Sequence, residues 1–401
     1  MALPASSGYR GAIMLSPTRI IAAVFAGCLL VSLALPVAQA QTSADSSVSP
    51  RAWISLPSLP EPAASLTGAA VNGKFYVFGG RDGTALNGPR SKGLVYEYDT
   101  ANDTWTRKRP MPVPLHHPAV AAYGDRIYLF GGFRTPARNG GWQPVADAWA
   151  YDPATDNWEP LTPMAEPRGG AAAAAIDGKF YVIGGAAAAA APGDGDANGM
   201  TIDDRRRHDV LASVVEYDPK TGRWRARAAM PTSRSQAVAV ARLGRIFVIG
   251  GRLGSTFANG SETDIVEAYE PAADRWSAPL ARLPTARSSA GGALWRHLIV
   301  VAGGSIAGGQ TMTARPSALV DAYDTIANRW ISLAPLPQPR AGFAAGVIGD
   351  RFHAVGGTVP GEATQTALDQ PGVTDTAADT AASALAHALE LDTATGPSRP
   401  R

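Results

Sequence analysis

One motif recurs along this 401-residue chain at a nearly constant interval. A Gly-Gly pair is followed by an aromatic-acid dipeptide, and a tryptophan stands six residues after the acid, as in Gly79-Gly80, Tyr98-Asp99 and Trp105. The pairs that begin these repeats lie 52, 53, 66, 53 and 53 residues apart. A period near fifty residues is typical of proteins built from repeated supersecondary units. The other pairs are Gly131-Gly132, Gly184-Gly185, Gly250-Gly251, Gly303-Gly304 and Gly356-Gly357.

One repeat, residues 171–226, shows what each unit is expected to form. Two apolar runs flank Asp177-Gly178, and Asp-Gly between such runs predicts a tight β-hairpin. The second run is apolar at consecutive positions, which indicates a strand that is covered on both faces. Val214 to Asp218 predicts a third strand, and Trp224 begins a fourth, outer strand. Each repeat is therefore predicted to be a four-stranded antiparallel sheet that buries its faces by stacking against neighbouring sheets.

These Gly-Gly pairs, Tyr-Asp dipeptides and tryptophans resemble the kelch family of β-propellers over nearly all of residues 51–392. The resemblance implies an all-β, six-bladed kelch propeller. It is shared, more distantly, with the copper-radical oxidases related to galactose oxidase and with an exported bacterial propeller that epimerises N-acetylneuraminate. Because kelch propellers serve as enzymes, glycan binders and protein-interaction modules, the fold alone does not give the function.

The sixth repeat has Leu391-Asp392 after its glycine pair and no tryptophan. Trp53 instead stands near the start of the repeat region, 26 residues before Gly79, as Trp105 stands 26 residues before Gly131. We therefore expect an N-terminal strand at Trp53 to complete the last blade by pairing near residues 388–392. The alternative is that Trp53 lies in an N-terminal tail and belongs to no blade.

The first forty residues are predicted to be a signal peptide. Arg10 and Arg19 precede the apolar run from Ile20 to Leu35, and Ala38-Gln39-Ala40 is a small-x-small cleavage site. Residues 41–50 would be a short linker and 51–401 the propeller, so a periplasmic or secreted protein is expected. A lipoprotein anchored at Cys28 is the less favoured alternative, because a strongly apolar stretch follows that cysteine.

Charge and cysteine content exclude several classes of function. Without residues 1–40 the chain carries 34 basic and 34 acidic residues, which gives no reason to expect a nucleic-acid partner. No later run reaches the roughly 18 apolar residues of a transmembrane helix. Cys28 is the only cysteine, so the mature chain lacks the tyrosine–cysteine cross-link on which the related copper-radical oxidases depend. No cofactor is expected, and the oligomeric state is left open.

The binding surface is expected on one face of the propeller, where the loops leading into the inner strands meet the loops after the Gly-Gly pairs. We call it the lead-in face. Four lead-in loops carry an arginine at equivalent positions, and a repeated arginine favours a structural role over a ligand role. Residues that depart from the repeat are better ligand candidates, and arginines among them would suit an anion. These candidates are Arg81, His116, His117, Gln236 and Arg252.

Two repeats carry long insertions, at residues 186–213 and 358–386, in blades that stand opposite each other in a six-membered ring. They are expected either to arch over a central pocket or to be low-complexity decoration. The first contains Asp194, Asp196 and Asn198 at the oxygen spacing of a calcium loop, but Arg205 stands where a bidentate acid is needed. A weak calcium site is one interpretation and a polar turn is the other.

Two functions follow from these features. The first is an exported, non-catalytic protein that binds a glycan or a partner protein on the lead-in face. The second is a sugar mutarotase or epimerase that resembles the N-acetylneuraminate enzyme, which would need a general acid or base near the pocket. A pocket histidine or carboxylate with a shifted pKa beside arginines would favour the enzyme.

Overall fold

The computed structural model describes residues 53–82, 90–135, 142–188, 208–254, 261–307, 314–360 and 380–391, with the backbone alone at 380–382. The chain divides into Met1–Ser46 and Ser47–Arg401, and the described residues all belong to the second part. Within them every regular element is a strand. Accordingly, no helix of the described chain is long and apolar enough to cross a membrane. The predicted signal peptide and Cys28 lie outside the described residues.

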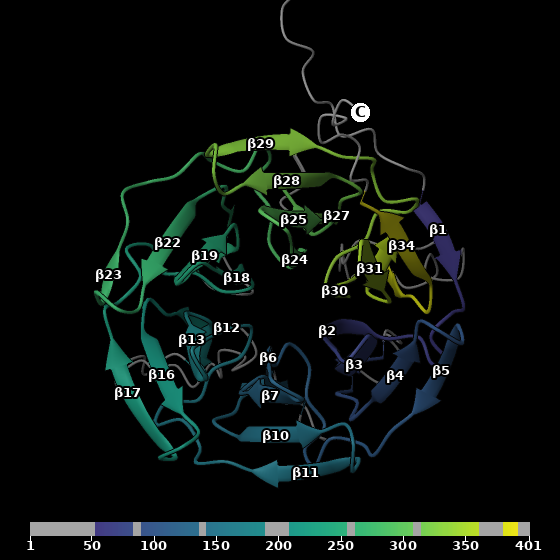
Figure 1. Ribbon diagram of the computed structural model, residues 1–401, viewed down its shortest axis with the longest axis horizontal. Helices are drawn as coiled ribbons and strands as arrows, with labels where there is room; N and C mark the ends of the chain where they lie inside the picture. Colours follow the sequence, from purple (N-terminus) through teal and green to yellow (C-terminus); the bar gives the residue numbers. More distant parts are fainter. Residues whose placement is uncertain are drawn as a thin grey trace, which may run out of the picture. The chain divides into compact units, whose positions relative to one another are not determined.

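Six four-stranded antiparallel sheets, the blades, stand around one axis (Figure 1). Blade 1 contains β2 (Ala64–Val71), β3 (Lys74–Arg81), β4 (Val95–Asp99) and β5 (Thr104–Arg107). Blade 2 contains β6 (Ala119–Tyr123), β7 (Arg126–Phe130), β10 (Ala148–Asp152) and β11 (Asn157–Pro160). Blade 3 contains β12 (Ala172–Ile176), β13 (Lys179–Ile183), β16 (Val214–Asp218) and β17 (Arg223–Arg227).

The other three blades complete the ring. Blade 4 contains β18 (Val238–Arg242), β19 (Arg245–Ile249), β22 (Val266–Glu270) and β23 (Arg275–Trp276). Blade 5 contains β24 (Gly291–Trp295), β25 (Leu298–Ala302), β28 (Val320–Asp324) and β29 (Arg329–Ser332). Blade 6 contains β30 (Ala344–Ile348), β31 (Arg351–Val355), β34 (Ala386–Glu390) and β1 (Trp53–Leu56). The inner strands β2, β6, β12, β18, β24 and β30 each contact the next, and β30 contacts β2, which confirms the predicted six-bladed propeller.

Each blade is buried on both faces, as the apolar runs predicted. In β13, Phe180 and Val182 pack in the cluster shared with blade 2, whereas Tyr181 and Ile183 pack in the cluster shared with blade 4. The hairpin before this strand turns at Asp177-Gly178, whose φ angles of 52° and 76° are those of the expected tight turn. Six such clusters, one between each pair of consecutive blades, make up the core.

The Gly-Gly pairs join each blade to the next. In blade 2 both glycines have positive φ, 57° at Gly131 and 112° at Gly132, and a Cβ at Gly131 would lie 2.2 Å from the carbonyl oxygen of Arg168. Only glycine fits this close approach. The second glycine then donates a backbone hydrogen bond to that same carbonyl in blade 3, at 2.9 Å. The same bond recurs at every blade boundary, including Gly357 to Ala63 between blades 6 and 1.

The tryptophans join the outer strands in the opposite direction. Trp224 tilts against Tyr217 of its own blade, with ring centroids 4.8 Å apart, and its Nε1 donates to the carbonyl of Thr162 in blade 2. In four blades the tyrosine hydroxyl donates to a residue five positions later; these residues are Asp103, Asp156, Asp274 and Asn328. The repeat motif is therefore a set of contacts within and between blades.

The N-terminal strand closes the ring as predicted. Trp53 pairs with Leu389, so β1 is the outer strand of blade 6. Its indole packs edge-on against Phe352, with centroids 6.4 Å apart, in the cluster shared by blades 5 and 6. The circle is completed by contacts between residues from the two ends of the described chain.

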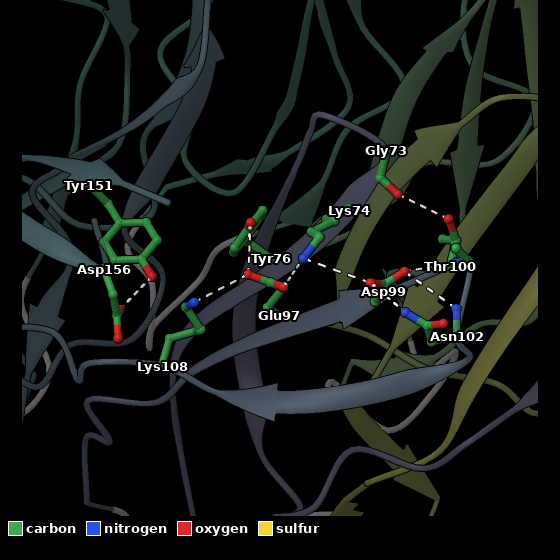
Figure 2. Close-up of polar contacts among 11 residues, drawn as sticks. Gly73, Lys74, Tyr76, Glu97, Asp99, Thr100, Asn102, Lys108, Tyr151 and Asp156 are labelled. Carbon is green, nitrogen blue, oxygen red and sulfur yellow. Dashed lines mark hydrogen bonds and ion pairs between the residues drawn. The ribbon is translucent and has the colours of Figure 1, made fainter. Parts of the chain in front are cut away.

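Two interfaces between blades also contain a buried carboxylate. Figure 2 shows Glu97 between the amines of Lys74 and Lys108 and the hydroxyl of Tyr76, which donates to it at 2.9 Å. Glu216 of blade 3 occupies the equivalent position with Lys179 and Arg227. In each case the neighbouring cations, together with hydrogen bonding, hold the pKa of the carboxyl below its usual value, against the opposite effect of burial. The two carboxylates stand on the third strands of their blades, β4 and β16, and not on the inner strands.

Candidate functional site

Three residues with a shared geometry, which we call the lead-in triplet, stand at the start of each blade. In blades 2 to 6 the triplet precedes the inner strand, and in blade 1 it overlaps the start of β2. The second residue pairs with the residue after that blade's Gly-Gly pair, as His116 does with Phe133. The two kinds of loop therefore lie on one face, as predicted. The triplets are Ala63-Ala64-Ser65, Leu115-His116-His117, Arg168-Gly169-Gly170, Arg234-Ser235-Gln236, Arg287-Ser288-Ser289 and Arg340-Ala341-Gly342.

The third residues of the triplets form a ring around the axis, which we call the axial ring. All six have a positive φ, between 49° and 61°. The amide of His117 donates to the carbonyl of Ser65, and the same bond links each following member to the previous one. The bond from Leu66 to Gly342 closes the ring, at 3.1 Å. The axial ring fixes the position of its side chains, because its backbone is held by six hydrogen bonds and by left-handed dihedrals.

Short two-stranded ribbons surround the axial ring. They continue the loops after the Gly-Gly pairs of blades 2 to 6, and their residues supply part of the lining described below. The ribbons are β8 (Phe133–Arg134) with β9 (Gln143–Pro144), β14 (Ala186–Ala188) with β15 (His208–Val210), β20 (Arg252–Leu253) with β21 (Ser261–Glu262), β26 (Ser305–Ile306) with β27 (Arg315–Pro316), and β32 (Thr358–Pro360) with β33 (Thr380–Ala382).

A pocket of about 260 Å³ lies inside the ribbons, on the lead-in face. Four of the five predicted ligand residues line it: Arg81, His117, Gln236 and Arg252. The fifth, His116, is fully buried beside it. Their placement is thus observed, and ligand binding by them stays a prediction.

Arg81 is a cation of the pocket, and no carboxylate among the described residues forms an ion pair with it. Its Nε donates to Ser65 Oγ at 3.2 Å, and its guanidinium carbon lies 5.6 Å from the ring centre of Trp142. Burial lowers the pKa of Arg81, and the nearby Asp82 carboxylate acts in the opposite direction. The guanidinium is therefore positioned, charged and available to an anion.

His116 and His117 form a direct pair. Their Nδ1 atoms lie 2.9 Å apart, so one ring donates and the other accepts. His116 stacks on Phe133 and meets Trp142 edge-on at 4.5 Å, and its Nε2 is buried without a hydrogen-bond partner among the described residues. Burial and the positive charge of Arg81 lower the pKa of His117 to about 3, and they hold the pKa of His116 well below its usual value. Both rings are neutral at pH 7.

The other side of the pocket carries an amide and hydroxyl groups. Ser289 Oγ donates to Gln236 Oε1 at 2.8 Å, which orients the Gln236 amide and leaves its NH₂ group as a donor. Ser288, Ser305 and Thr358 add further hydroxyls to the lining. This side suits a polar, uncharged part of a ligand.

Arg252 is different from Arg81, because a buried carboxylate pairs with it. Its Nη1 lies 2.6 Å from Glu262 Oε1, across the β20–β21 ribbon, and only 4% of the Glu262 side chain is exposed. Ser288 Oγ contacts the same carboxylate oxygen at 3.4 Å. The sequence predicted Arg81 and Arg252 as equivalent ligand residues. In the structure they differ, because Glu262 neutralises the charge of Arg252.

The four repeated arginines are structural, as the repeat pattern favoured. Each is fully buried and donates to backbone carbonyls of its own blade; they are Arg168, Arg234, Arg287 and Arg340. Three of them also pair with a carboxylate, from Glu166, Glu267 and Asp321 respectively. Arg340 instead meets His387 Nδ1 at 3.1 Å, and burial lowers its pKa to about 10. Arg81 and Arg340, in blades 1 and 6, are thus cations without a carboxylate among the described residues.

The calcium hypothesis concerns Asp194, Asp196 and Asn198, which lie outside the described residues. Only the ends of the two long insertions are described, and they form the β14–β15 and β32–β33 ribbons. Among the residues whose placement is described, no three His, Cys, Asp or Glu side chains are grouped to hold a metal ion.

Among the pocket residues that the sequence did not single out, Trp142 and Glu262 contact predicted ligand residues. Trp142 directly precedes β9 and Glu262 lies on β21. The ribbons differ in length from blade to blade, so the repeat pattern does not align these residues with anything. The only signal for Trp142 was a tryptophan outside the Tyr-Asp-to-Trp spacing. A lone tryptophan of this kind is more often part of a core than of a site, and here it contacts Arg81, His116 and His117.

Known proteins share this fold and repeat. The Attractin/LZTR1 β-propeller family matches residues 75–358. Kelch-like protein terF of Aspergillus terreus is 28% identical over 364 residues, which cover 88% of this chain and 74% of that protein. Kelch-like protein 25 of Xenopus tropicalis is 26% identical over 266 residues, which cover 66% of this chain. Kelch-like protein 23 of Mus musculus is 25% identical over 266 residues, which cover 60% of this chain.

This chain spans 40% and 45% of the length of those two vertebrate proteins. Among solved structures, one titled "Structure of YjhT" matches with a TM-score of 0.63 and 20% identity, over 76% of this chain and 93% of that one. At this identity the likeness shows the fold. Kelch propellers generally serve as binding or scaffold modules. The chain belongs to the Attractin/LZTR1 family of kelch-type β-propellers.

Proposed function

We propose that this chain is an exported binding protein that holds a glycan or a partner protein on the lead-in face, and that its pocket receives an acidic sugar. One observation carries the choice of ligand. Arg81 presents a guanidinium to the pocket, held by Ser65 and Trp142, without a carboxylate partner among the described residues. A planar, positioned guanidinium suits a carboxylate, which it can bind through two parallel hydrogen bonds.

The rest of the lining fits a sugar better than a protein surface. A concave pocket of about 260 Å³ suits a small ring such as a single sugar residue. Trp142 supplies an apolar surface, and Gln236 and the serines supply hydrogen-bond partners for hydroxyl groups. A glycan would enter with a terminal acidic residue, and a partner protein would contact the ribbons.

A direct test is calorimetry with glucuronate and N-acetylneuraminate, using glucose as the uncharged control. We expect the acidic sugars to bind and Arg81→Ala to weaken them by about 1.5–3 kcal/mol, the usual contribution of a charge-assisted hydrogen bond. Arg134→Ala is the matched control, because Arg134 also lies beyond a Gly-Gly pair but is exposed and outside the pocket lining. Equal binding of glucose and glucuronate would refute the role of Arg81.

A sugar mutarotase or epimerase is the second candidate, and His117 is the observation that favours it. A neutral imidazole in the pocket, beside Arg81, is able to accept a proton from a bound sugar. Its strongly lowered pKa also makes it a weak base, which is why we place binding first. Proton NMR of the α and β anomers of each acidic sugar tests this candidate. Faster anomer exchange with the wild type than with His117→Asn would support an enzyme.

A further inference from the structure

We propose that binding of an acidic ligand in this pocket is coupled to the uptake of one proton by the His116–His117 pair. This inference rests on the proposed function, because the coupling needs an anion beside Arg81. It assigns His116 a role that its burial behind the pocket does not by itself suggest.

The geometry of the pair provides the proton site. The two Nδ1 atoms are 2.9 Å apart and share one hydrogen when both rings are neutral. A further proton would bind at Nε2 of the ring whose Nδ1 donates, and the contact would become an imidazolium–imidazole hydrogen bond, which is stronger than the neutral bond because the donor is charged. His117 reaches the pocket, whereas His116 is enclosed by Phe133 and Trp142. One ring is thus next to the ligand and the other stabilises its added charge.

The charged groups around the pair decide when that proton binds. Arg81 on β3 opposes it in the free protein, and the Asp82 carboxylate partly offsets Arg81. On β15, His208 contacts Phe133 and the carbonyl of Trp142, and its own pKa is lowered by burial. Across the pocket, Arg252 and Glu262 cancel each other's charge. Burial is thus the larger cause that keeps the pair neutral, and Arg81 is the charged group that adds to it.

An anion on Arg81 removes this opposition. The ligand carboxylate cancels the guanidinium charge and attracts the protonated pair, so the pKa of the pair is higher in the complex than in the free protein. Between the two pKa values, binding takes up a proton, and lowering the pH strengthens binding. The coupling is reciprocal: the bound ligand raises the affinity of the pair for a proton by the same factor by which the bound proton raises the affinity for the ligand.

The test is calorimetry of glucuronate and N-acetylneuraminate from pH 7 to 4.5, in pairs of buffers that differ in ionisation enthalpy. Sugar carboxylates stay ionised above about pH 4.5, so proton uptake reports on the protein. We expect uptake to rise toward one proton as the pH falls, with affinity increasing by up to about tenfold per pH unit at full coupling. His117→Asn should abolish the uptake, because asparagine tolerates the positive φ of this position but does not titrate there.

Two further variants make the result specific. His116→Phe keeps an aromatic ring against Phe133 and Trp142 and removes the Nδ1 partner, so it should reduce the uptake. His297→Asn is the control, because the described hydrogen bonds of His297 are made by its backbone carbonyl. This variant should retain the full proton uptake. Binding without proton uptake, or uptake that persists in His117→Asn, would overturn the coupling and leave the proposed function standing. No binding of either sugar at any pH would overturn both.

Discussion

The Nε1 of Trp53 donates a hydrogen bond to the carbonyl of Ala334, 281 residues later in the chain, at 3.1 Å. Trp105, in the next blade, makes the equivalent bond to Pro57, which follows β1. The first described strand thus takes part in the same outer series of contacts as the strands inside the chain. Closure depends on β1, because blade 6 would otherwise have three strands and an uncovered cluster.

Trp53→Ala should lower the free energy of unfolding by up to about 3–5 kcal/mol, since it removes a large, partly buried aromatic side chain that packs against the cluster shared by blades 5 and 6. Urea unfolding at pH 7 measures this. Ile54→Ala is the control on the same strand, because 38% of Ile54 is exposed, and it should cost less than about 1 kcal/mol. A loss below about 1 kcal/mol for Trp53→Ala would contradict closure by this residue.

His353 makes the boundary between blades 6 and 1 sensitive to pH. It stacks on Phe75 of blade 1 with centroids 5.9 Å apart, and burial lowers its pKa to about 4. The unfolded chain, with a pKa near 6.5, then binds more protons than the folded one between these values. The stability that His353 contributes is present above about pH 6.5 and is lost as the pH falls through 4.

We therefore expect His353→Phe to lose less stability than the wild type between pH 7 and 4.5, by up to about 3 kcal/mol. Urea midpoints of both proteins at the two pH values give the difference. Other buried histidines titrate in the wild type and the variant alike, so they cancel in this comparison. Identical pH dependence of the two proteins would show that His353 has the same pKa in the folded and the unfolded chain.

His387 occupies the position in blade 6 that Asp321 occupies in blade 5, opposite the buried arginine. Because the Arg340 charge is already buried without a carboxylate, His387→Asp should stabilise the protein by about 1 kcal/mol or more and raise the pKa of Arg340. Asp321→His is the reciprocal control and should destabilise, since it leaves Arg287 in the same condition. Thermal unfolding near pH 8 measures both, and destabilisation by His387→Asp would mean that the site prefers a neutral partner.

The repeat motif allowed the fold to be predicted because each of its residues makes a contact that every blade needs. Gly131-Gly132 meets the next blade, Tyr151 binds Asp156, and Trp158 reaches back to Arg109. Even the exception was informative, since Trp53 supplied the tryptophan that the last repeat lacks. In a circular fold the first strand can complete the last blade, and here the spacing of Trp53 from Gly79 was enough to predict it.

The site was less predictable because it lies where the repeat stops. The sequence indicated the lead-in face, but it could not show that adjacent histidines differ in direction. The positive φ of His117 turns its side chain to the pocket, whereas His116 pairs with Phe133 and is buried. Nor could spacing show that Glu262, on a ribbon, would neutralise Arg252. Ligand identity depends on these pairings rather than on the residue types alone.

The Arg252–Glu262 pair sets the net charge of the pocket and gives a test of the acidic-sugar proposal by gain of affinity. Glu262→Gln keeps a side chain of the same shape whose amide oxygen can still accept from Arg252, but it removes the negative charge. The pocket would then hold two uncompensated guanidinium groups, so glucuronate should bind several-fold more tightly and with a steeper dependence on salt.

Arg252→Ala should have the opposite effect, because it leaves the Glu262 carboxylate without its partner next to the ligand. Calorimetry of both variants at 50 and 300 mM salt distinguishes the charge effect from a change of shape, since only the charge effect is screened. Glucose should be indifferent to either change. If Glu262→Gln instead weakens glucuronate binding, the carboxylate itself accepts hydrogen bonds from the sugar hydroxyls, and Arg252 serves to orient it.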